Sequence, residues 1–146
     1  MGLVERTYPC VLCFDTLFWL KYERDVAHLR THFNRKVELK NLMHRDALLL
    51  ENFDLLLFPI HRVLGQTSHW FLIACDISER AIHVIDSFNL HAQQYFYYTE
   101  RIEFLLKQVL GPKDWGVCYY DNLPRQQNGE DCGVALCINA AQLARC

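Results

Sequence analysis

Residues 69–85 hold the stretch that decides the fold: His69-Trp-Phe-Leu-Ile-Ala-Cys-Asp-Ile77, then Ser78-Glu-Arg80, then Ala81-Ile-His-Val-Ile85. Two apolar runs of strand length stand on either side of a short polar turn. This is the pattern of two antiparallel strands joined as a hairpin, and we expect the hairpin to lie within a larger sheet. Because the second strand returns past the first, Asp86 at its end is expected to lie near His69.

The flanking segments predict a sheet packed with helices. Asp54 to Ile60 is a continuous apolar run, typical of a strand buried on both faces, and Pro59 is expected to mark where its pairing stops. Trp115 to Tyr120 is a further short strand candidate. Helical spacing occurs in residues 14–33, with a break expected near Arg24, in Tyr95 to Leu110, which Gly111-Pro112 should end, and in Cys132 to Leu143. This order favours an α+β layered domain.

Composition narrows the class of protein. A chain of 146 residues with 51% hydrophobic content can bury a core, and we expect one domain over residues 1–146. A net charge of -2 with scattered Lys and Arg argues against nucleic acid as a partner. The apolar runs are too short to cross a membrane. Seven cysteines, an odd number, without a signal peptide predict a reducing intracellular compartment, with most thiols acting as small buried hydrophobes.

Cys132 is the candidate nucleophile. It stands at the predicted start of the last helix, where unpaired N–H groups and the positive end of the dipole stabilise a thiolate. Gly133 allows close approach, and the N–H of Cys132 can point at a developing oxyanion. Gln126, six residues upstream, is the candidate side chain for the oxyanion hole, and Gln127 is a rival that spacing alone does not separate.

A thiol nucleophile needs a base, and the base needs a third group that orients it. His69 at a strand start and Asp86 at the end of the neighbouring strand form a plausible pair. Each residue also has an ordinary structural explanation. A His at a strand end is usually only polar, an Asp before Ser87 is usually a turn former, and a Cys in an apolar helix is usually core.

The segment Gln126-Gln-Asn-Gly-Glu-Asp-Cys-Gly133 resembles the nucleophile motif Q-x-N-G-x-D-C-G of the sentrin/SUMO-specific (ubiquitin-like-specific) cysteine proteases. Pro59-Ile-His61, His69-Trp70 and Ile85-Asp86-Ser87 look like the P-I-H, H-W and D-S elements of that family. The resemblance runs from about residue 14 to about residue 139. It implies a papain-like α+β core, with a small mixed or antiparallel sheet and the nucleophile at a helix N-terminus.

The resemblance also implies roles for the residues. His69, Asp86, Gln126 and Cys132 are expected to be catalytic, and the motif favours Gln126 over Gln127. Trp70 is expected to cover the C-terminal Gly-Gly of a substrate; without the motif it would be a half-buried strand residue. The implied activity is cleavage after the C-terminal Gly of SUMO or another ubiquitin-like modifier. We expect a monomer in the nucleus or cytoplasm that needs no cofactor.

Three alternatives stay open. One is a weak or inactive module that binds a ubiquitin-like protein, since the chain begins after the family's W-L-x-D-type segment and ends before its last helix. An acetyltransferase can share the Cys/His arrangement. Finally, Cys10, Cys13, His28 and His32 imitate a two-Cys, two-His zinc site, although fourteen residues separate the two pairs where about twelve are expected.

Overall fold

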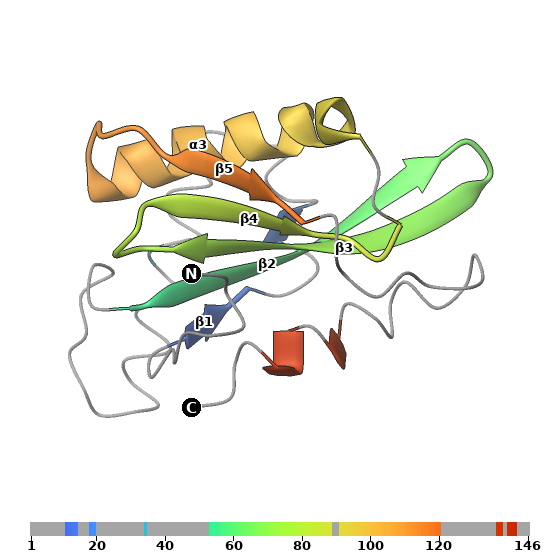
Figure 1. Ribbon diagram of the computed structural model, residues 1–146, viewed down its shortest axis with the longest axis horizontal. Coiled ribbons are helices and arrows are strands. Elements are labelled where there is room, and N and C mark those ends of the chain that lie inside the picture. The colour runs from blue at the N-terminus through green and yellow to red at the C-terminus, as the bar shows by residue number, and fades with distance from the viewer. Residues whose placement is uncertain are drawn as a thin grey trace.

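The computed structural model describes residues 11–14, 18–19, 34, 53–88, 91–120, 137–138 and 140–142. Within these ranges five strands form one sheet in chain order (Figure 1). The strands are β1 (Val11–Cys13), β2 (Leu55–Leu64), β3 (Thr67–Asp76), β4 (Ala81–Ile85) and β5 (Gly116–Tyr119). The sheet is mixed: the two outer pairs, β1–β2 and β4–β5, are parallel, and the two inner pairs are antiparallel.

The predicted hairpin is confirmed as β3 and β4, joined by a turn over residues 77–80. Its register pairs Leu72 with Ile85 and Asp76 with Ala81. The second strand candidate, Trp115 to Tyr120, is confirmed over Gly116–Tyr119 and runs parallel to β4.

A short 3-10 helix, η4 (Ala92–Tyr95), leads directly into the α-helix α3 (Phe96–Leu110). The helix predicted for Tyr95 to Leu110 is therefore confirmed. It ends at Gly111, whose φ of 98° lies in a region that side chains with a Cβ rarely adopt. Of the helix predicted for Cys132 to Leu143, the described residues 137–138 and 140–142 are helical.

Pro59 does not end β2, contrary to the sequence prediction. The carbonyl of Leu57 accepts from the N–H of Phe14 at 2.9 Å and therefore faces β1. Alternate residues of a strand present their N–H and C=O to the same edge, so Pro59 also faces that side, past the end of β1. The missing N–H of Pro59 removes no bond to β3, and pairing continues through Pro59–Leu72 to Leu64–Thr67.

The N-terminal region also differs from the prediction. The sequence reading missed β1, because three residues are too few to show a period. Phe14, the expected first residue of a helix, instead follows β1 and bonds to Leu57. Phe18 and Trp19 are helical; the remainder of the predicted helix lies almost entirely outside the described residues.

The main hydrophobic core lies between α3 and one face of the sheet. Ile102, Leu105 and Leu106 of α3 pack there with inward residues of β2, β3 and β4. A smaller cluster covers the opposite face, with Leu57, Leu72 and Ile85 among its buried members and Ala140 packed against it. Burial on both faces explains why β2 and β3 are apolar almost throughout.

Candidate active site

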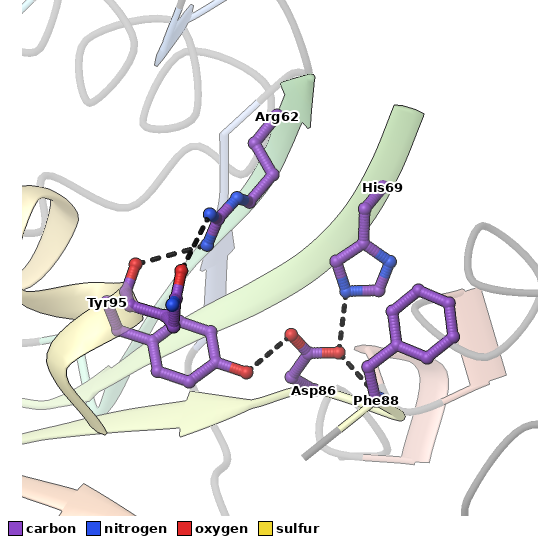
Figure 2. A network of polar contacts seen from close by, with 6 residues as sticks. Arg62, His69, Asp86, Phe88 and Tyr95 are labelled. Atoms are coloured by element: carbon purple, nitrogen blue, oxygen red, sulfur yellow. Dashed lines mark hydrogen bonds and ion pairs between the residues drawn. The ribbon is translucent and has the colours of Figure 1, made fainter. Parts of the chain in front are cut away.

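The structure brings His69, near the start of β3, into contact with Asp86, which directly follows the end of β4. His69 Nε2 lies 2.7 Å from Asp86 Oδ1, and the two residues are only 1% and 4% exposed (Figure 2). The pairing follows from the register, since Ile85 lies opposite Leu72 and Asp86 is the next residue beyond β4. Alternation of side chains then places Asp86 on the same face of the sheet as His69.

Three donors converge on the carboxylate of Asp86. Its Oδ1 accepts from His69 and from the backbone N–H of Phe88 at 2.8 Å, and its Oδ2 accepts from the hydroxyl of Tyr95 at 2.6 Å (Figure 2). An ionised carboxylate only accepts hydrogen bonds, so Nε2 of His69 carries the proton in this contact. The carboxylate therefore selects one tautomer of the imidazole.

The other ring nitrogen, Nδ1 of His69, is buried and has no hydrogen-bond partner among the described residues. When Nε2 carries the proton of the neutral ring, Nδ1 carries the basic lone pair. Buried polar atoms are nearly always paired, so this nitrogen requires a partner that the described residues do not supply. Nδ1 is the atom of this site that can exchange a proton with a nucleophile.

Aromatic rings fix the plane of the imidazole. The ring of Phe88 stacks on His69 with centroids 4.3 Å apart and planes at 29°, and Phe71 lies 6.4 Å away on the same strand as His69. The stack therefore orients His69.

Trp70 projects from the opposite face of the sheet, because neighbouring residues of a strand point to opposite sides. It packs against the smaller core cluster and is half-buried. The ring of His61 on β2 lies 4.5 Å from that of Trp70, across a directly paired position. The expectation that Trp70 binds substrate stays a prediction.

Cys132 and Gln126 lie outside the described residues, and so does the start of the helix that Cys132 was predicted to occupy. Their roles therefore stay predictions. The same holds for three of the four residues of the zinc prediction. The fourth, Cys13, lies in β1, and no cluster of three or more His, Cys, Asp or Glu suited to a metal occurs in the described ranges.

The described cysteines differ in exposure from the sequence prediction. Only Cys75 of the four is buried, while Cys13 and Cys137 are exposed and Cys118 is intermediate. Burial raises the pKa of the Cys75 thiol far above its usual range, so it stays protonated. Cys75 is consequently an unreactive core residue, as expected for a small buried hydrophobe.

Sequence reasoning missed Tyr95 and Phe88 as parts of this site. Phe88 could have been found, because an Asp often accepts from the N–H two residues later in an Asx turn. Asp86 is thus a turn former and the partner of His69 at once. No sequence pattern pointed to Tyr95, because its contact with Asp86 depends on the path that the chain takes back to the sheet.

None of the helices in the described part of the chain combines the length and apolar character that a membrane span needs.

A mixed five-stranded sheet with a helix on one face and a strand-end His–Asp pair defines a papain-like α+β fold. The predicted α+β fold with a small mixed sheet is therefore confirmed, while the nucleophile at a helix N-terminus stays a prediction. A solved C-terminal Ulp1 protease domain, in complex with Smt3, the yeast orthologue of SUMO, superposes with a TM-score of 0.65 at 22% identity. The match covers 95% of this chain and 59% of that one. A structure described as a de-sumoylating protease gives 0.57 at 18% identity, over 94% of this chain and 52% of its own.

The chain belongs to the Ulp1 protease family, because residues 11–145 match the family's C-terminal catalytic domain. A sentrin-specific protease of Caenorhabditis elegans is 28% identical over 139 residues, which are 91% of this chain and 18% of the relative. Ubiquitin-like-specific protease 1 of Saccharomyces cerevisiae is 26% identical over 145 residues, 95% of this chain and 21% of the relative. The chain thus spans about a fifth of the length of these relatives.

Proposed function

We propose that the chain is a single cysteine protease domain that cleaves after the C-terminal Gly of SUMO or another ubiquitin-like modifier. The observation that carries the proposal is the state of His69: Nε2 is bound to Asp86, and Nδ1 is buried without a partner among the described residues. A base held in this way is ready for a thiol. Family membership and the motif around Cys132 support Cys132 as that thiol.

In the proposed reaction, the Cys132 thiol gives its proton to Nδ1 of His69, and the thiolate attacks the Gly carbonyl carbon. The N–H of Cys132 and the amide of Gln126 donate to the oxyanion. The tetrahedral intermediate collapses as Nδ1–H protonates the departing amine, which breaks the C–N bond and leaves a thioester. Water then attacks the thioester and gives one proton to Nδ1; the C–S bond breaks, the thiolate leaves, and the released carboxylic acid loses its remaining proton to solvent.

Asp86 has an electrostatic role in this scheme. His69 becomes positively charged when it takes the thiol proton, and the adjacent carboxylate stabilises that charge in a site closed to water. Trp70 is proposed to cover the Gly-Gly end of the modifier, so that residues with side chains are excluded. SUMO or another ubiquitin-like protein and its conjugates are the proposed partners.

The test uses a panel of ubiquitin-like proteins, SUMO and ubiquitin among them, that carry a C-terminal electrophile. The expected result is a covalent adduct with at least one of them, detected by intact mass, that is lost in Cys132→Ser. Cys137→Ser is the matched control, because Cys137 is an exposed cysteine on a helical segment and should leave the adduct unchanged.

An adduct that persists in Cys132→Ser would overturn the choice of nucleophile. Reversible binding without an adduct would replace the protease with a binding module. If neither binding nor an adduct occurs with any modifier, the proposed substrate class is wrong.

A further inference from the structure

Tyr95 is the last residue of η4 and reaches Asp86 from outside the sheet. Its side chain is 2% exposed, and its hydroxyl donates to Asp86 Oδ2 at 2.6 Å (Figure 2). Within the described part of the chain, no other donor reaches that oxygen. Tyr95 and His69 therefore hold different oxygens of one carboxylate.

The ring of Tyr95 is held by packing and not by the hydroxyl alone. It lies 5.3 Å from Phe71 in an edge-to-face arrangement and 5.9 Å from Tyr119 of β5. Phe71 is on the same strand as His69, two residues away. These contacts fix the phenol relative to β3 without any help from Asp86.

A second contact ties η4 to the strand pair that carries His69. Arg62 of β2 donates from Nη1 to the carbonyl of Gln94 at 3.1 Å and from Nη2 to Gln94 Oε1 at 3.3 Å. Arg62 is the register partner of His69 across β2 and β3, and Gln94 precedes Tyr95. These contacts form a closed loop. His69 bonds to Asp86, and Asp86 bonds to Tyr95. Gln94, the residue before Tyr95, bonds to Arg62, which pairs with His69 across the strands.

We propose that Tyr95 is a positioning residue for the proposed hydrolysis, because its hydroxyl holds Asp86 Oδ2 and thereby aims Oδ1 at His69 Nε2. The inference rests on the proposed function. A carboxylate held through Oδ1 alone can turn about the Cβ–Cγ bond, and His69 then loses the partner that sets its tautomer. Tyr95 acts through Asp86 and His69, and it touches neither thiol nor substrate in this scheme.

The variant Tyr95→Phe removes the hydroxyl and keeps the ring that packs on Phe71. Loss of one hydrogen bond to a charged group can lower a rate by roughly tenfold to a hundredfold. We expect kcat to fall about tenfold with KM unchanged. Tyr97→Phe is the matched control: it makes the same change two residues away at an exposed ring and should leave kcat as it is.

Two further measurements separate positioning from a purely structural role. In an Asp86→Asn background, Tyr95→Phe should cost less than about twofold in kcat, because residues that act as a unit are not additive. The proton on Nε2 of His69, in its 2.7 Å contact with a carboxylate, should also give a far-downfield NMR signal. That signal should broaden or vanish in Tyr95→Phe and persist in Tyr97→Phe.

A Tyr95→Phe variant with unchanged kcat and an unchanged Nε2 proton signal overturns the inference. So does a tenfold loss that is repeated in full in the Asp86→Asn background. If Tyr95→Phe alone does not fold, the double variant with Asp86→Asn leaves no buried charge without its partner, and a tenfold loss of its kcat relative to Asp86→Asn still overturns the inference. The NMR signal tests the link from Tyr95 to His69 even if the chain forms no adduct. Failure of this inference can therefore be distinguished from failure of the proposed function.

Discussion

His61 and Trp70 face each other across β2 and β3, with ring centroids 4.5 Å apart and planes tilted by 41°. They lie on the face of the sheet opposite His69, although Trp70 is the very next residue after it. One strand thus presents the proposed base to one side and the proposed substrate-binding ring to the other. The cross-strand contact holds the indole in place.

Trp70→Ala is expected to raise KM on the order of tenfold, because a large aromatic contact to the substrate is lost. If the indole excludes side chains, the variant should also gain activity on a modifier whose penultimate Gly is replaced by Ala. Kinetics with the two modifiers measure both effects. Val63→Ala, at a 69% exposed position on β2, serves as control. An unchanged KM with no gain on the Ala substrate would show that Trp70 does not contact the substrate.

Asp86→Asn is expected to lower kcat by roughly 10² to 10⁴, since an amide cannot balance the charge of protonated His69. An amide also has one oxygen where the carboxylate offers two to His69, Phe88 and Tyr95, so at least one donor loses its acceptor. Single-turnover rates measure the effect. Asp114→Asn makes the same change at an exposed carboxylate and should keep the parent rate. Equal activity of the two variants would remove Asp86 from the mechanism.

Phe58→Ala is expected to cost about 3–5 kcal/mol of unfolding free energy. Phe58 is 1% exposed, and its ring stacks on Phe14 at 4.5 Å and 7°, which joins the end of β1 to β2. Urea unfolding followed by circular dichroism measures the loss. The exposed change Val63→Ala on the same strand should stay within about 0.5 kcal/mol. A cost for Phe58→Ala as small as that of Val63→Ala would contradict the packing described for this strand.

The buried thiol of Cys75 should make stability depend on alkaline pH. Its pKa is raised from an ordinary value of 9.0 by burial, so above pH 9.0 the unfolded chain releases this proton and the folded chain keeps it. The folded state then binds more protons, and the unfolding free energy falls as pH rises, by about 1.4 kcal/mol per unit from this group.

Cys75→Ala removes that dependence. The stability difference between parent and Cys75→Ala should be constant below pH 9.0 and should shrink above it, as measured by urea unfolding from pH 7 to 10.5. Ile73→Val, a buried change on the same strand without a titratable group, should show a constant difference throughout. A constant difference for Cys75→Ala as well would mean that the thiol ionises within the folded protein.

Several parts of the fold could be read from the chain because they depend on local patterns. The β3–β4 hairpin follows from two apolar runs around a polar turn, and α3 follows from its spacing and from Gly111. The contact between His69 and Asp86 was expected from that hairpin, and the register of β3 and β4 brings it about. By contrast, β1 is three residues long, and the run of β2 through Pro59 depends on which edge faces a neighbour. Neither feature produces a periodic pattern of apolar residues in the sequence.

The amino-acid sequence alone determined the hairpin and pointed to His69 and Asp86 as two residues that the sheet brings into contact, because alternation and turn chemistry act over a few residues. Only the tertiary structure decided that Tyr95 would hold the second oxygen of Asp86 and that Phe88 would stack on His69. Those contacts depend on the path by which η4 returns to the sheet, and that path is set by packing across the whole core and not by neighbouring residues.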